Sequence, residues 1–102
     1  MIHVLAIITT KPGKRGEVLT AFRSIVPTVR KEEGCIEYGA AIDADAIGSV
    51  QTRLGPDTYV VVEKWASAAA LAAHSTSPHM AEFRTKTKDL MANRVIHVLS
   101  PA

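Results

Sequence analysis

The chain is poor in cysteine and has no concentration of charge of one sign. Cys35 is its single cysteine in 102 residues, so no intramolecular disulfide can form. A single cysteine without an intramolecular disulfide suits a protein of a reducing compartment. The formal net charge is only +2, and the 12 lysines and arginines are scattered along the chain. Because nucleic-acid surfaces usually show a basic stripe, this distribution argues against a nucleic-acid partner.

Long hydrophobic runs and cofactor-binding motifs are also missing. The apolar stretch from Val4 to Ile8 is too short for a membrane span or for the core of a signal peptide. Met1-Ile2-His3 supplies no basic segment ahead of it. No GxGxxG, P-loop or HExxH pattern occurs, so no sequence feature requires a dinucleotide, nucleotide or metal cofactor. We therefore expect a cytoplasmic protein with no membrane span and no cofactor.

What is present is a regular succession of short apolar segments. Branched apolar runs bounded by glycine, proline and aspartate predict strands at residues 2–9, 35–42, 58–65 and 94–99. Apolar residues at helical spacing predict a helix over 17–31, with Pro27 inside it as a source of a kink. Ser67 and the Ser77-Pro78 pair each begin a further helix. The connection 43–54 is too long for a tight hairpin, and connections of that length are often functional or contain an extra strand piece.

This βαββαβ order predicts one ferredoxin-like α+β domain over residues 1–102, with helices on one face of a four-stranded antiparallel sheet. Both faces of the sheet should be apolar, because side chains alternate along a strand. In the first strand, for example, Val4 and Ala6 point one way while Leu5 and Ile7 point the other. One layer of helices covers only one face. We therefore expect a homodimer in which the uncovered faces meet.

The end of the third predicted strand has the features of a binding site. Glu63 and Trp65 share one face of that strand with Tyr59, and the helices behind Trp65 return over this face carrying His74 and His79. Two imidazoles, a carboxylate and aromatic rings around an otherwise apolar space are typical of a small pocket for a flat organic molecule.

These residue types suit the oxidation of a dihydroxyaromatic compound by dioxygen. Such substrates react slowly with triplet dioxygen, and loss of a phenolic proton makes them better electron donors, so a base is needed. Imidazole suits this task because its ordinary pKa is about 6.5. His79 and His74 are the catalytic candidates. His79 is slightly favoured, because the first turn of a helix disfavours the imidazolium form. Trp65, Phe83, Tyr38 and Glu63 are the candidate substrate-binding residues.

Four of the six candidates also have a structural interpretation. Trp65 and Tyr38 are consistent with core aromatics, and His74 with a link between the two short helices. Glu63 either orients a histidine or forms an ordinary salt bridge. His74, His79 and Glu63 together offer zinc ligands, but without a recognised spacing, so no metal site is predicted.

Several segments together resemble the antibiotic-biosynthesis-monooxygenase (ABM) family, and within it the bacterial enzymes that oxidise menadiol-type quinols. They are Pro12-Gly13, Ile25–Val29, Lys31-Glu32-Glu33-Gly34-Cys35, Glu63-Lys64-Trp65, Ala73-His74 and Ser77-Pro78-His79-Met80. The resemblance implies a dimeric α/β-barrel with a pocket between the helices and sheet of each subunit. It also implies a small aromatic or quinol substrate, dioxygen as the second substrate, and no metal or flavin.

The same resemblance disfavours haem cleavage. Haem-degrading relatives use an asparagine and a histidine at positions that hold Ile7 and Arg84 in this chain. Two other functions stay open: a non-oxidative isomerase of small carbonyl compounds, and a module that binds a quinone or aromatic without turnover. An RNA-binding sheet shares the element order, but it would need exposed stacking aromatics and an RNP1 pattern, and this sequence has neither.

Overall fold

The computed structural model describes residues 1–102 and has the expected βαββαβ order. Its elements are β1 (Ile2–Thr10), α1 (Arg15–Arg30), β2 (Cys35–Ala41), β3 (Thr58–Trp65), α2 (Ala68–Ser75), α3 (Pro78–Thr87), a 3-10 turn (Lys88–Leu90) and β4 (Met91–Leu99). The predicted third strand is confirmed at both ends. The last strand begins earlier than predicted, because Met91 already belongs to β4 and pairs with Thr10.

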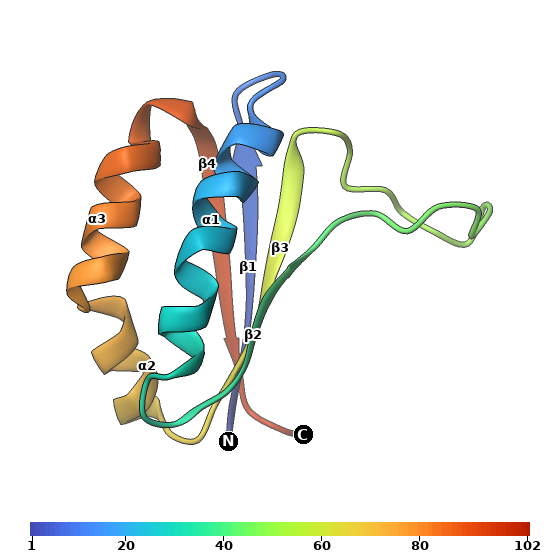
Figure 1. Cartoon of the computed structure of the whole chain (residues 1–102). Coiled ribbons are helices and arrows are strands. Elements are labelled where there is room, and N and C mark those ends of the chain that lie inside the picture. Colours follow the sequence, from blue (N-terminus) through green and yellow to red (C-terminus); the bar gives the residue numbers. More distant parts are fainter.

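The four strands form one antiparallel sheet in the order β2-β3-β1-β4. All three helices lie on the same side of it, with α1 and α3 next to each other (Figure 1). This is the ferredoxin-like arrangement that the order of elements predicts. The return of the chain through α1 brings β2 beside β3, so residues far apart in sequence become neighbours at one end of the sheet.

The helices begin where the local sequence favours it. The Ser67 hydroxyl accepts a hydrogen bond from the Ala70 amide at 3.1 Å, which caps α2 as predicted. Pro78 occupies the first turn of α3, where its missing N–H costs nothing. Helix α1 continues past Pro27 as far as Arg30. None of these helices combines the length and apolar character needed to cross a bilayer.

The core lies between the helices and the inner face of the sheet. β1 and β3 alternate as predicted and direct their inner-face side chains toward the helices. Trp65 and Tyr59 are the largest fully buried side chains. α1 contributes Val18, Phe22 and Val29 to the same core. Because Glu63 lies on this face, its carboxylate is buried among apolar groups.

The outer face of the sheet is apolar and carries no helix. Leu5 pairs with Val62 on one side and with His97 on the other, and Ile7 pairs with Val60 and Val95 in the same way. Leu5 and Val95 are 37% and 41% exposed. The alternation that predicted a second apolar face is therefore confirmed. His97 lies on this face and not near the pocket.

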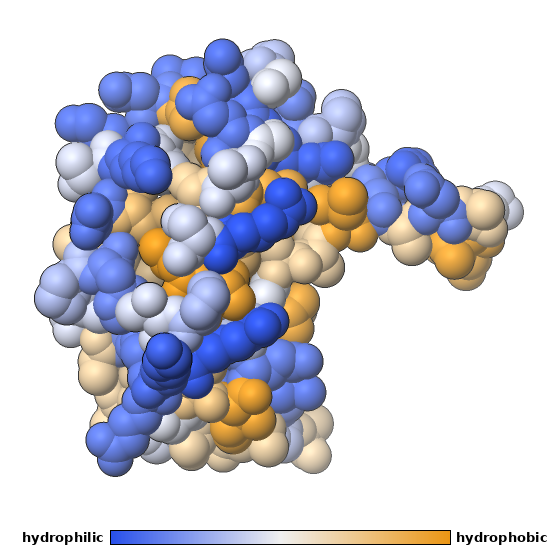
Figure 2. Space-filling model, viewed as in Figure 1, coloured by the Kyte–Doolittle hydropathy of each residue, from blue (hydrophilic) through white to orange (hydrophobic).

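The connection between β2 and β3 forms an arm that projects from the body of the molecule (Figure 1). It contains no strand of its own. The Asp43 carboxylate closes its base by accepting hydrogen bonds from the amides of Leu54 and Gly55, both at 2.9 Å. These two bonds hold the pKa of Asp43 below its usual value. Ile47 and Val50 of this connection are exposed, and Figure 2 shows hydrophobic surface on the projecting arm.

Candidate active site

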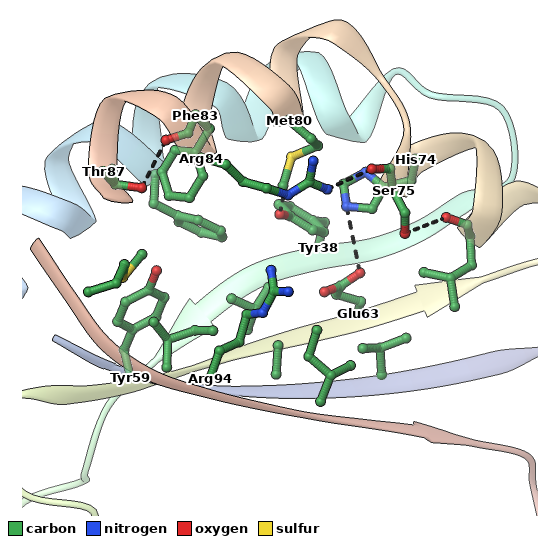
Figure 3. A pocket seen from close by; sticks show the side chains of 18 of the residues that line it. Tyr38, Tyr59, Glu63, His74, Ser75, Met80, Phe83, Arg84, Thr87 and Arg94 are labelled. Atoms are coloured by element: carbon green, nitrogen blue, oxygen red, sulfur yellow. Dashed lines mark hydrogen bonds and ion pairs between the residues drawn. The ribbon is translucent and has the colours of Figure 1, made fainter. Parts of the chain in front are cut away.

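A cavity of about 410 Å³ lies between the inner face of the sheet and helices α2 and α3 (Figure 3). A volume of this order accommodates a two-ring aromatic molecule. Most of its lining is apolar or aromatic, with a few polar groups on both sides. The lining residues that matter here are Phe22, Tyr38, Tyr59, Glu63, His74, Met80, Phe83, Arg84, Lys88 and Arg94.

The structure brings four of the six predicted site residues to this cavity. Tyr38, Glu63, His74 and Phe83 line it, whereas Trp65 and His79 do not. The Trp65 side chain is completely buried behind the cavity, with its ring centre 4.6 Å from that of His74. Trp65 therefore acts as a support for the imidazole, not as a wall of the pocket.

His74 is positioned at the end of α2 and is only 4% exposed. Its Nδ1 lies 2.8 Å from Oε2 of Glu32. A carboxylate oxygen accepts hydrogen bonds, so Nδ1 carries the proton in this contact. In the neutral imidazole Nε2 is then the free basic nitrogen. Nε2 lies on the opposite edge of the ring, 4.0 Å from Oε1 of Glu63, which also lines the cavity.

Glu32 is a candidate site residue that sequence reasoning missed. It follows α1 in the turn before β2, and the same Oε2 atom also lies 2.9 Å from Nε2 of His79. One carboxylate oxygen thus joins His74 and His79. In the sequence Glu32 belongs only to the acidic pair before Gly34, at the end of a helix. The one signal for it was the likeness of residues 31–35 to the family pattern.

Glu63 combines burial with one strong hydrogen bond. The Trp65 indole donates to its Oε1 at 2.9 Å. Burial raises the pKa of the Glu63 carboxyl above its usual value, although the indole hydrogen bond and the nearby His74 act in the opposite direction. Glu63 is therefore held in place by the residue two positions further along the same strand, with its carboxyl close to the basic nitrogen of His74.

Aromatic rings form the wall of the pocket next to these groups. The Tyr38 and Phe22 rings stack with centres 5.4 Å apart, and Phe83 meets Phe22 edge-on at 6.2 Å. Burial raises the pKa of Tyr38 well above its usual value and that of Tyr59 to about 12. Neither phenol is then a base at neutral pH. His74 is the pocket group best suited to accept a proton.

Three side chains are arranged so that they could also hold a cation. The ligand atoms of Glu32, His74 and His79 all lie within 4.8 Å of one another. Their contacts of 2.8 and 2.9 Å also match two imidazole N–H donors on one oxygen. The zinc set considered from the sequence contained Glu63 in place of Glu32. Glu63 approaches the other edge of the His74 ring, so that set does not converge on one point.

The fold is that of a monooxygenase family. Residues 1–86 match the antibiotic biosynthesis monooxygenase (ABM) family, and the chain belongs to it. Probable quinol monooxygenase YgiN of Escherichia coli K12 is 42% identical over 103 aligned positions, which span 99% of this chain and 98% of YgiN. The expectation of an enzyme of this family, similar to quinol monooxygenases, is confirmed.

Solved structures show the same fold. PA3566 from Pseudomonas aeruginosa superposes with a TM-score of 0.81 at 25% identity, covering 99% of this chain and 93% of its own. Rv0793 from Mycobacterium tuberculosis reaches a TM-score of 0.80 at 24% identity, covering 99% and 94%. The ferredoxin-like architecture is therefore shared with solved proteins at about 25% sequence identity.

Proposed function

We propose that this protein uses dioxygen to oxidise quinols or related electron-rich aromatics, without a bound cofactor. The observation that carries the proposal is the buried His74 imidazole. Glu32 holds one of its nitrogens, while the other faces an apolar, aromatic-lined cavity beside Glu63. The likeness to YgiN, which is named a probable quinol monooxygenase, supports this substrate class.

His74 is the base in this scheme, which reverses the slight preference for His79 drawn from the sequence. Nε2 of His74 takes a phenolic proton from a substrate lying between the sheet and α3. The resulting imidazolium is stabilised by Glu32, whose oxygen lies 2.8 Å from Nδ1. His79 contacts the same oxygen and supports the position of Glu32. Nothing in this step requires a metal or an organic cofactor.

The deprotonated quinol then transfers an electron to dioxygen, giving a semiquinone and superoxide within the pocket. If these recombine at a ring carbon, the His74 imidazolium returns its proton to the peroxide, the O–O bond breaks, and the products are a hydroxylated quinone and water. If a second electron is transferred instead, the products are the quinone and hydrogen peroxide. The apolar lining suits both outcomes, because it keeps bulk water away from the reactive pair.

Oxygen uptake tests the proposal. Menadiol should consume oxygen faster with the protein than without it, after subtraction of autoxidation. Exhaustive chelation and dialysis should leave that rate unchanged, because His74 alone supplies the base. Labelled dioxygen with mass spectrometry distinguishes the hydroxylated quinone from the quinone. Uptake no faster than autoxidation would contradict the proposal, and dependence on an added metal would contradict its cofactor-independent form.

We further propose that the outer face of the sheet binds a second copy of the chain. Its apolar centre around Leu5 and Val62 lacks any covering element. We expect sedimentation to show a dimer at micromolar concentration. Leu5→Lys should raise the dissociation constant roughly 100-fold, because the symmetric interface would bury two charges. Ala69→Lys adds the same charge on an exposed helix and should change little. A folded wild-type monomer would contradict this interface.

A further inference from the structure

Three cationic side chains line the largely apolar pocket. Arg84 of α3, Lys88 after it and Arg94 of β4 all line the cavity, whereas Glu63 is its only acidic lining residue. None of the three cations has a carboxylate within 4.0 Å, since the salt bridges of the chain all involve other residues. Glu63 itself is buried and engaged by Trp65. The pocket therefore presents three cationic side chains that its one acidic lining residue does not pair with.

Arg94 lies on the edge strand β4, where it is exposed to solvent while its side chain also lines the cavity. It pairs in register with Ile8 of β1, and its neighbours on the same face of β4, Ile96 and Val98, are apolar. In Figure 3 its guanidinium points from β4 into the cavity toward the helices. No salt bridge of the chain engages this guanidinium, so an anion in the cavity can accept charge-assisted hydrogen bonds from it.

Arg84 approaches from the opposite side of the cavity. It extends along α3 and α2, where its Nη2 donates to the carbonyl of Ser75 at 2.6 Å (Figure 3). This bond uses one of the five guanidinium N–H donors and fixes the direction of the side chain. Sheet and helix layers thus each contribute one arginine to the same cavity. A planar anion matches the forked geometry of both guanidinium groups.

We propose that the preferred ligands are flat aromatics bearing a carboxylate, which Arg94 binds with support from Arg84. The inference rests on the proposed function in taking the ligand to be an aromatic. The ring would lie against Tyr38 and Phe83, and the carboxylate would accept hydrogen bonds from Arg94. A neutral analogue of the same shape would keep the ring contacts and lose the charge-assisted bonds.

Calorimetry with two matched ligands tests this subsite without relying on turnover. 2-Naphthoate and 2-naphthamide have nearly the same shape and differ in charge. We expect the wild-type protein to bind 2-naphthoate about tenfold or more tightly than the amide, as charge-assisted hydrogen bonds require. Arg94→Gln should remove most of that preference, and Arg84→Gln part of it. Lys86→Gln removes a charge from the same helix outside the pocket and should change the ratio less than about twofold.

The outcomes separate this inference from the proposed function. Equal binding of both ligands, or a preference that survives Arg94→Gln, would overturn the carboxylate subsite and leave the oxidation of neutral quinols standing. Selective binding of 2-naphthoate without any enhanced oxygen uptake would support the subsite and contradict the monooxygenase. Binding of neither ligand would contradict the subsite and the use of this cavity for two-ring aromatics.

Discussion

His74→Ala should lower the turnover number for menadiol by about 10² to 10⁴, the usual contribution of a general base. The substitution removes the only imidazole that lines the cavity, so the phenolic proton loses its acceptor. Affinity for the oxidised quinone should change less, because the aromatic wall remains. Oxygen-electrode rates over a range of substrate concentrations separate the two effects. Circular dichroism should show that the variant is folded.

His79→Ala is the matched control for that loss. It removes an imidazole bonded to the same Glu32 oxygen but absent from the cavity lining. We expect a reduction of no more than about tenfold, because the base itself is untouched. If His79→Ala abolishes turnover and His74→Ala does not, the assignment of the two histidines is the reverse of our proposal. If both variants retain wild-type rates, neither is the base.

Glu32→Gln isolates the carboxylate from the imidazoles. Glutamine keeps the size of the side chain and a carbonyl oxygen that can accept both N–H bonds, but it carries no negative charge. We expect turnover to fall about tenfold or more, because the imidazolium loses its ionic partner. A rate equal to that of the wild type would show that Glu32 has only a structural role.

Trp65→Ala should lower the free energy of unfolding by about 3–5 kcal/mol, the range for removing a large aromatic from a core. The indole is completely buried and packs against both Tyr38 and His74. Its removal also leaves Oε1 of Glu63 without its hydrogen-bond donor. Urea denaturation followed by circular dichroism measures the change, with the slope of the transition checked for two-state behaviour.

Trp65→Phe separates the packing of the ring from its hydrogen bond. Phenylalanine restores much of the volume but cannot donate to Glu63, so a cost of about 1–3 kcal/mol should remain. If Trp65→Ala lowers the free energy of unfolding by less than about 1 kcal/mol, the surrounding residues must have collapsed into the space left by the ring. Retained turnover in Trp65→Phe would place Trp65 outside the chemistry, in agreement with its position behind the cavity.

Local sequence determined the elements and the two faces of the sheet. Alternation along residues 58–65 placed Glu63 and Trp65 on one face, and the structure shows both buried there. The same alternation in β1 separated Val4 and Ala6 from Leu5. These features follow from local backbone geometry, because successive side chains of a strand point to opposite faces of the sheet. The order of elements then predicted a ferredoxin-like arrangement, in which the helices bury their apolar faces against the sheet.

Local sequence was less informative about element ends. The beginning of β4 at Met91 was placed too late, because the segment after α3 has no glycine or proline to mark the change. Its pairing with Thr10, far away in the chain, sets that boundary. The arm between β2 and β3 was recognised only by its length, and the hydrogen bonds of Asp43 across it were not apparent.

Only the tertiary structure decided which side chains of the candidate site contact one another. Glu32 lies 42 residues from His74 and 47 from His79, and neither contact has a local pattern. A turn has no fixed period, so the direction of the Glu32 side chain depends on how the end of α1 packs against α2 and α3. The same packing directed His74 into the cavity, left His79 outside it and placed Trp65 behind it. Sequence supplied the residue types needed for the chemistry, and the packing of helix ends on the sheet determined which of them meet.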